Sequence, residues 1–358
     1  MNERSASLAP PKQRILLYGA TGYTGQRVAR RLVAEGVDVV LAARNAQALS
    51  SLARTLRVPW VEVSLDQPAR LDQALSTCGA VLHAAGPFVK TAEPMMMAAL
   101  RCGVHYLDLA GEWPVFTRAQ QLDRQAIKAG VMMMPGVGFT IVASDCLLKL
   151  VAQQHRQIRS LRLAISRPDQ ISAGTLRSML GLVDETVLVR RNGALTSKPV
   201  GSLWHTFDFG HGTRRALAVN WPDVVTAEFT TGVPTIEAFA EVNGVDEDIY
   251  RLSALAAPLL SIPVVNRSLG GLTNLFTPST RQASHSSGFV LVVEAVDQWR
   301  RTFSRRLQTS DGYTVTVDTV AAVVRHVLNG VCQAGFMTPA RLLGTALIDE
   351  CPSMALMD

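Results

Sequence analysis

Short apolar runs alternate with amphipathic segments of helical periodicity along the first part of the chain. Each run has the length of a strand that is buried on both faces, and glycine or proline often follows it. The pattern predicts six strands, each followed by a helix, at residues 15–18, 37–42, 58–63, 80–85, 104–109 and 131–134. Strict alternation of this kind is typical of an α/β fold, a Rossmann-type doubly wound parallel sheet.

The hydrophobic pattern changes from about residue 160. Apolar and polar residues alternate over residues 161–166, and a helix is expected over residues 173–182. Further strand-like runs lie at residues 216–219, 224–229, 236–242 and 289–296. Strands without regular intervening helices indicate a second α+β lobe, with a largely antiparallel sheet and helices on one face.

These patterns predict how the chain is divided. A helix near residues 319–328 and the turn at Thr338 and Pro339 are expected to return to the first lobe. The expected parts are a disordered tail, a Rossmann domain, an α+β domain, and a C-terminal segment that rejoins the Rossmann domain, at residues 1–12, 13–145, 146–312 and 313–358.

Composition narrows the functional classes. With 48% hydrophobic and 18% charged residues among 358, the chain can bury a large core. The net charge of +6 comes from scattered arginines and forms no basic stripe interleaved with aromatics, which argues against nucleic-acid binding. The apolar stretch 252–276 is broken by prolines and glycines, so no integral membrane segment is expected. It could instead be an active-site flap, a dimer face or a lipid-surface contact.

The cysteines and histidines indicate neither a disulfide framework nor a metal site. The five cysteines form no Cys-x-x-Cys pair, and their odd number favours a reducing cytoplasmic location. No group of His, Cys and Asp has the spacing of metal ligands, so no metal is expected.

Three glycines spaced three apart, Gly19, Gly22 and Gly25, follow the first strand and open a helix. Glycine permits a tight turn, lets backbone amides approach a diphosphate, and lets the helix pack near the strand. The helix N-terminus adds free N–H groups and partial positive charge. The predicted diphosphate-binding residues are therefore Gly19, Ala20, Thr21, Gly22, Tyr23, Thr24 and Gly25.

The end of the second strand selects the cofactor. An Asp or Glu here would hold the ribose hydroxyls of NAD, but this chain has Ala42 and Ala43. Arg44 and Asn45 come next, and an arginine without the acid favours the 2′-phosphate of NADP(H). A surface arginine at a strand end is the alternative interpretation.

Residues at the other strand ends complete the candidate site, because ligands of such sheets lie off the carboxyl ends of the strands. Asp66 follows the third strand and either meets the adenine or caps the next helix. Small residues after the fourth strand, Ala85, Gly86 and Pro87, would let the nicotinamide ribose lie against the backbone. Glu112 follows the fifth strand and is included in the cofactor site.

A proton donor is harder to assign. Short-chain dehydrogenases need a Tyr-x-x-x-Lys pair, and no lysine after the fold begins has tyrosine four residues before it. The candidates are Tyr106, Asp108 and His205, with water and His211 as alternatives. His83 lies within the fourth strand and is expected to be a core histidine.

Together, four segments resemble the saccharopine dehydrogenase-like reductases, a family that includes trans-acting enoyl reductases: residues 19–25, 43–45, 85–88 and 103–112. Residues 135–139, 144–145, 311–316 and 335–340 are also similar to family segments, although Thr140 and Ala143 depart from the family pattern. The resemblance implies NADP(H) binding, a second α+β lobe and a homodimer.

The sequence thus predicts an NADPH-dependent oxidoreductase that reduces a C=C, C=N or C=O bond of a small, largely apolar metabolite. Two alternatives stay open. One is a saccharopine-like, imine-forming amino-acid dehydrogenase, and the other is a non-catalytic NADP(H)-binding sensor or scaffold.

Overall fold

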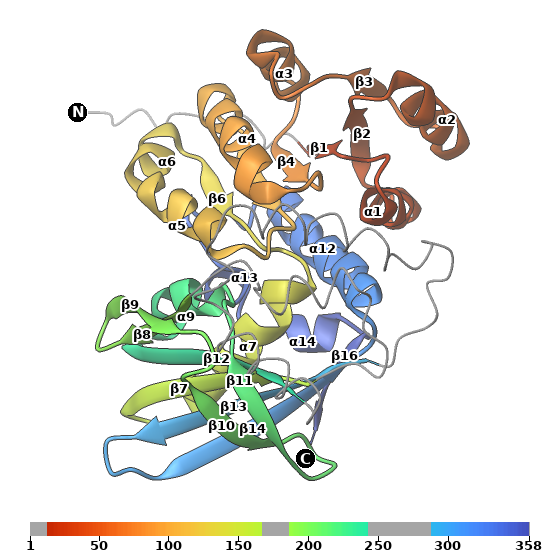
Figure 1. The fold of residues 1–358 in the computed structure, drawn as a ribbon. Coiled ribbons are helices and arrows are strands. Elements are labelled where there is room, and N and C mark those ends of the chain that lie inside the picture. Colours follow the sequence, from red (N-terminus) through yellow and green to blue (C-terminus); the bar gives the residue numbers. More distant parts are fainter. Residues whose placement is uncertain (1–12, 167–185, 243–287, 358) are drawn as a thin grey trace, which may run out of the picture. The chain divides into compact units, whose positions relative to one another are not determined.

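The computed structural model describes residues 13–166, 186–242 and 288–357 (Figure 1). The chain divides into two compact units. Unit 1 contains the described residues up to Val142 together with Thr316–Cys351, and unit 2 contains those of Ala143–Val315 and of Pro352–Asp358. Two helices, α7 (Phe139–Gln154) and α12 (Gly312–Leu328), each contribute residues to both units.

Unit 1 is built on a parallel sheet in the order β3-β2-β1-β4-β5-β6-β15. Its strands are β1 (Arg14–Tyr18), β2 (Asp38–Ala43), β3 (Trp60–Glu62), β4 (Ala80–His83), β5 (His105–Asp108), β6 (Met132–Met134) and β15 (Gly335–Phe336). The six strands predicted in the first part of the chain are all present, so the predicted Rossmann-type fold is confirmed. β1 and β4 are nearly completely buried, as expected for strands covered on both faces.

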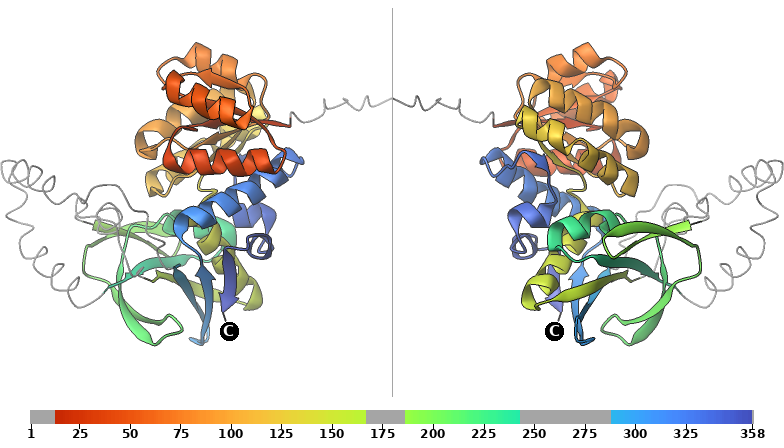
Figure 2. Two further views of the ribbon diagram at one scale, coloured as in Figure 1. Left: turned by 90° about the vertical axis from the view of Figure 1, so that its right-hand side faces the viewer. Right: turned by 90° about the vertical axis from the view of Figure 1, so that its left-hand side faces the viewer.

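Six helices connect these strands: α1 (Tyr23–Ala34), α2 (Ala46–Leu56), α3 (Pro68–Leu75), α4 (Phe88–Cys102), α5 (Trp113–Gln121) and α6 (Asp123–Ala129) (Figure 2). From β1 the chain first moves outward to β2 and β3, and then crosses back to β4 on the other side of β1. Strand order reverses between β1 and β4, and the crevice above this point is where ligands of such sheets bind.

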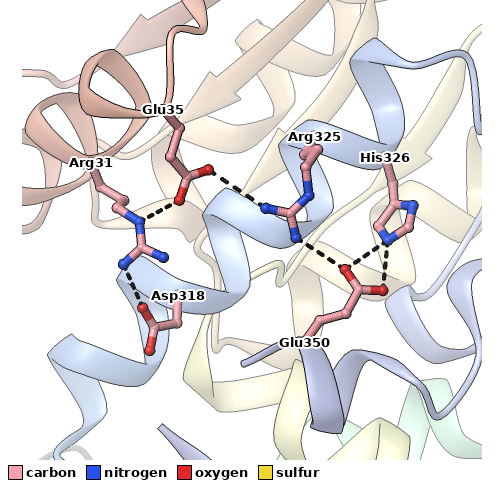
Figure 3. Close-up of polar contacts among 6 residues, drawn as sticks. All are labelled: Arg31, Glu35, Asp318, Arg325, His326 and Glu350. Carbon is pink, nitrogen blue, oxygen red and sulfur yellow. Dashed lines mark hydrogen bonds and ion pairs between the residues drawn. The ribbon is translucent and has the colours of Figure 1, made fainter. Parts of the chain in front are cut away.

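The C-terminal segment of unit 1 packs beside α1. Its elements are most of α12, then β15, α13 (Pro339–Leu343) and α14 (Leu347–Glu350). β15 extends the parallel sheet by pairing with β6. A polar network joins α1, α12 and α14 on the surface through Arg31, Glu35, Asp318, Arg325, His326 and Glu350 (Figure 3). These pairs are partly exposed, so each contributes little alone, and the network gives α12 a fixed register on α1.

Unit 2 has a mixed, mostly antiparallel sheet in the order β10-β11-β12-β7-β13-β14-β16, with β8 joined to β12 and β9 to β8. Its strands are β7 (Ile158–Ile165), β8 (Thr186–Arg191), β9 (Ala194–Pro199), β10 (Trp204–Asp208), β11 (Thr213–Ala218), β12 (Thr235–Glu241), β13 (Val290–Asp297), β14 (Thr302–Thr309) and β16 (Met354–Met357). Only β12 and β7 pair in parallel among these strands. The predicted largely antiparallel second sheet is confirmed.

One predicted strand of unit 2 is wrong. Residues 224–229 are not a strand but part of helix α9 (Asp223–Thr231). The run looked strand-like because the helix is buried along most of its length, from Asp223 to Ala227, and so shows no polar face. Gly232, with a φ of 74°, ends the helix in the left-handed conformation that glycine favours.

The end of the chain also differs from the prediction. The C-terminal segment expected to rejoin the Rossmann domain, residues 313–358, belongs to unit 1 over Thr316–Cys351, and β16 then pairs with β14 in the sheet of unit 2. The predicted helix at residues 173–182 and the apolar stretch 252–276 lie outside the described residues.

The sheet of unit 2 is strongly curled. β10 is four strands away from β13 in the sheet order, yet His205 Nε2 of β10 lies 2.8 Å from Glu294 Oε2 of β13. At the last residue of β10, Arg306 of β14 donates to Asp208 at 3.0 Å. The curled face encloses a buried cluster that includes Phe207, Phe209, Phe239 and Val292.

No helix among the described residues is long and apolar enough to cross a membrane. All five cysteines are free thiols. Within the described ranges, no three His, Cys, Asp or Glu side chains gather as a metal site would require.

Candidate cofactor site

The glycine turn between β1 and α1 leaves no room for a side chain at Gly19 or Gly25. Gly19 has a φ of 87°, and a Cβ there would lie 2.8 Å from the Ala84 carbonyl carbon. A Cβ on Gly25 would lie 2.2 Å from the Gly19 oxygen. The turn therefore packs backbone to backbone against both its own helix and the end of β4. Only glycine satisfies both contacts, which is the physical basis of the motif.

The N-terminus of α1 is arranged to receive an anion. Its N-cap is Gly22, no side chain caps the helix, and its first turn has no acidic residue. Gly22 donates its N–H to the Gly19 oxygen at 3.0 Å, which closes the turn. Gly22 and Tyr23 are exposed. An uncapped helix end with partial positive charge and no competing carboxylate fits a diphosphate.

Arg44 lies at the end of β2 beside this turn. Its side chain is exposed, and Asn45 follows as the N-cap of α2, where its Oδ1 accepts the Ala48 N–H at 3.0 Å. Burial raises the pKa of Tyr18, at the end of β1, while the neighbouring Arg44 opposes the rise. Arg44 is thus placed near the carboxyl ends of β1 and β2, where a 2′-phosphate would be expected.

Asp66 follows β3 and precedes the first residues of α3. The N-cap of α3 is Gln67, with no side-chain cap, so Asp66 does not cap that helix. Asp66 is exposed and, like Arg44, acts electrostatically on Tyr18. Its position is compatible with the predicted contact to adenine, and that contact stays a prediction.

Hydrogen bonds of Thr91 hold the loop that follows β4. Thr91 Oγ1 lies 2.7 Å from the Ala85 oxygen, to which it donates, and 3.0 Å from His83 Nε2. His83 is fully buried, which confirms its predicted place in the core. Burial lowers its pKa to about 3, so the ring is neutral and its Nε2–H donates to Thr91. The chain His83–Thr91–Ala85 therefore orients the loop in which Gly86 and Pro87 form a cis peptide.

Glu112 braces two loops of the site. Its Oε2 accepts the Gly111 N–H at 3.0 Å, and its Oε1 accepts the Phe88 N–H at 3.4 Å. The carboxylate thus joins the loop after β5 to the start of α4. In the structure Glu112 contacts backbone, and its predicted contact with the cofactor stays a prediction.

Tyr106 and Asp108 form a buried pair behind the loops. Both are fully buried, and the Tyr106 hydroxyl donates to Asp108 Oδ2 at 2.6 Å. Asp108 Oδ1 accepts the N–H groups of Ala110 at 2.8 Å and Gly136 at 2.7 Å. Burial, opposed by these three donors, raises the pKa of Asp108 to about 6. The pKa of Tyr106 is raised well above 10.0 by burial and then by Asp108.

His205, the third predicted catalytic residue, belongs to unit 2. Its ring packs edge-on against Phe207, with centroids 4.7 Å apart, and its Nε2 faces Glu294. The His205 side chain is 31% exposed, so it can reach solvent, whereas Tyr106 and Asp108 cannot.

A second pair of buried acids was not predicted. Asp145 of α7 accepts a hydrogen bond from Thr230 of α9 at 2.6 Å, and Asp223 begins α9. Both carboxyl groups are fully buried. Burial, and then Asp145, raise the pKa of Asp223 well above its ordinary value.

The structure brings the predicted cofactor residues of unit 1 to one edge of its sheet, at the carboxyl ends of β1, β2, β4 and β5. Sequence reasoning missed Thr91, which holds the loop after β4, and it did not foresee that Gly136 of the segment 135–139 would donate its N–H to Asp108. Thr91 follows Pro87 by one helical turn, and this spacing was the available signal.

Comparison with known proteins agrees with this geometry. Residues 15–134 match the family model of the saccharopine dehydrogenase NADP binding domain. Trans-acting enoyl reductases of Mycobacterium ulcerans and Mycobacterium tuberculosis are each 29% identical over 139 residues, covering 37% of this chain and 33% of each relative. The chain thus matches about a third of the length of these curated relatives.

Two solved structures share the fold over nearly the whole chain. Saccharopine dehydrogenase (L-Glu forming) of Saccharomyces cerevisiae has a TM-score of 0.66 and 13% identity, covering 97% of this chain and 100% of the other. Homospermidine synthase of Legionella pneumophila, in complex with NAD, has a TM-score of 0.64 and 10% identity, covering 97% and 92%. The fold, the resemblance and the predicted NADP(H) cofactor are confirmed. Over residues 15–134 the chain is similar to the NADP-binding domain of saccharopine dehydrogenase.

Proposed function

We propose, from the premise that residues 15–134 form a saccharopine dehydrogenase NADP-binding domain, that this chain is an NADPH-dependent reductase. Its substrate is a small, largely apolar metabolite. The reduced bond is C=C, C=N or C=O, and the mycobacterial relatives named as enoyl reductases favour C=C.

The glycine turn is the observation that carries the proposal. Side chains are excluded at Gly19 and Gly25 by backbone contacts, and the neighbouring helix end has neither a cap nor an acid. A turn that served only to connect a strand to a helix would need no such open, positively polarised end. The residues present therefore fit a dinucleotide.

Each part of the site has a stated task in this proposal. The α1 N-terminus binds the diphosphate, Arg44 pairs with the 2′-phosphate, and the loop at Ala85–Pro87 supports the nicotinamide end. The bound cofactor supplies a hydride for a polarised double bond. In this proposal the buried Tyr106 and Asp108 position the site, because Asp108 accepts hydrogen bonds from the loops at Ala110 and Gly136.

His205 is the proton donor in this scheme, since its side chain is accessible and the other two candidates are buried. Glu294 Oε2 lies 2.8 Å from His205 Nε2 and orients the ring. The apolar surroundings of His205, Phe207 and Phe239, fit a substrate with little charge.

Calorimetric titration with NADPH and NADH tests the first step. Wild type should bind NADPH at least about tenfold more tightly than NADH, or about 1.4 kcal/mol. Arg44→Ala should lose this preference, whereas Arg54→Ala, an exposed arginine on α2, should keep it. Equal affinity for the two cofactors in wild type would refute the role of Arg44.

Turnover tests the second step. NADPH oxidation would be followed with α,β-unsaturated thioesters, imines and aldehydes of increasing chain length. His205→Gln should lower kcat and change its pH profile while NADPH affinity is unchanged. Tight NADPH binding without oxidation by any substrate would instead support the non-catalytic sensor or scaffold.

A further inference from the structure

One end of the unit 2 sheet carries an unusual concentration of positive charge. The end consists of the turn between α7 and β7 and the turn between β13 and β14, which we call the arginine–tryptophan tip (residues 155–159 and 297–305). The two turns lie side by side, because the Gln298 N–H donates to the Gln157 oxygen at 3.1 Å (Figure 1). The tip contains five arginines and one acidic residue, Asp297.

The arginines of the tip are exposed and little compensated. They are Arg156, Arg159, Arg300, Arg301 and Arg305, and all of them are exposed. Arg301 pairs with Asp297, whose side chain is fully buried, yet Arg301 itself stays 64% exposed. Arg305 donates to a neutral Gln154. In the described part of the chain, no ion pair is formed by Arg156, Arg159 or Arg300.

An exposed tryptophan lies at the apex. Trp299 is 58% exposed, the largest value among the exposed large apolar side chains of the described residues. The Arg301 guanidinium lies 4.9 Å from the Trp299 ring centroid and 5.7 Å from that of Phe303. His155 stacks on Phe303 with centroids 3.7 Å apart.

The turn that presents these side chains is built rigidly. Asp297 Oδ1 accepts the N–H groups of both Trp299 and Arg301 at 2.9 Å. Arg300 has a φ of 65°, in the left-handed region that glycine occupies more readily. Trp299, Arg300 and Arg301 thus occupy a tight turn in which glycine or small polar residues are usually found.

We propose that the arginine–tryptophan tip binds the surface of an anionic lipid membrane. Arginine side chains are attracted electrostatically to anionic headgroups, and indole rings prefer the boundary between headgroups and acyl chains. The apex of a two-stranded turn is narrow and convex, so it can insert one indole. A stable protein interface would instead need about 800 Å² on each partner. This inference is independent of the proposed reductase activity.

Sedimentation with large vesicles tests the proposal. The full chain would be mixed with vesicles of phosphatidylcholine alone, or of phosphatidylcholine with phosphatidylglycerol, at low and physiological salt. We expect binding to the anionic vesicles only, weakened by salt. Each arginine removed should weaken it about fivefold, corresponding to about 1 kcal/mol.

A double substitution and a matched control give the sharpest comparison. Trp299→Ala with Arg300→Gly removes the indole and one charge, and glycine suits the positive φ of residue 300. Trp60→Ala with Arg57→Gly is the control, because Trp60 is 42% exposed and Arg57 has a φ of 57°. We expect the first pair to weaken binding by about tenfold or more, and the control to bind as wild type does.

Three results would overturn the proposal: no binding to anionic vesicles, equal losses in the two double variants, or Trp299→Ala alone leaving binding unchanged. The last result, together with equal binding of soluble polyglutamate or single-stranded DNA, would indicate an acidic polymer as the partner. Thermal unfolding of each variant would confirm that the hairpin is folded. NADPH affinity should be unchanged throughout, which separates this test from that of the reductase.

Discussion

Replacing the buried Asp108 with asparagine should remove one component of the pH dependence of stability. The pKa of Asp108 is about 6 in the folded protein, against an ordinary 3.8. Between these two values the folded state holds a proton that the unfolded state has released. The free energy of unfolding therefore falls as pH rises through this interval, and the fall is complete above the folded pKa.

The size of this effect follows from the two pKa values. The difference between 3.8 and about 6 corresponds to about 3 kcal/mol, at about 1.36 kcal/mol per pH unit. Asparagine carries no charge at any pH but preserves the geometry. Its Oδ1 can accept the N–H groups of Ala110 and Gly136, and its Nδ2 can donate to the Tyr106 oxygen.

Urea unfolding followed by circular dichroism, at several pH values between about 3 and 7, measures the difference. The unfolding free energy of Asp108→Asn minus that of wild type should rise by about 3 kcal/mol from the acidic to the neutral end of the series, because only wild type loses the contribution of Asp108. Asp108→Ala is the contrast, because it leaves two backbone donors and the Tyr106 hydroxyl without an acceptor. Parallel pH profiles of wild type and Asp108→Asn would refute the reasoning, since Asp108 would then titrate alike in both states.

Two further predictions concern the loops around the cofactor. Gly25→Ala places a Cβ 2.2 Å from the Gly19 oxygen, so it should lower stability by about 1–3 kcal/mol and also weaken NADPH binding. Gly22→Ala has a φ of −69° and its nearest contact at 3.3 Å, so it should weaken NADPH binding but keep the wild-type Tm. Equal Tm losses in both would count against the backbone contact. Thr91→Val removes the donor to the Ala85 oxygen and should weaken NADPH binding, whereas Thr91→Ser keeps the hydroxyl and should bind NADPH as wild type does. Calorimetric titration of both variants with NADPH checks this prediction. Identical affinities would show that Thr91 does not position the loop.

The sequence alone determined the nucleotide-binding half of the protein. A six-strand apolar pattern, three glycines at fixed spacing and a missing acid before Arg44 predicted the sheet, the turn and NADP(H). These features can be read locally, because a buried parallel strand and a tight turn impose their requirements on adjacent residues.

Only the tertiary structure decided how the remaining residues are used. Tyr106 and Asp108 are catalytic candidates from their place at a strand end, and only the fold shows that Asp108 also accepts the N–H of Gly136 from a second loop. The run 224–229 resembled a strand because a helix buried on most sides has no polar face to reveal its period. Trp299 and its arginines form one surface only because two distant turns meet. Partners of this kind depend on chain folding over long separations, which no local pattern encodes.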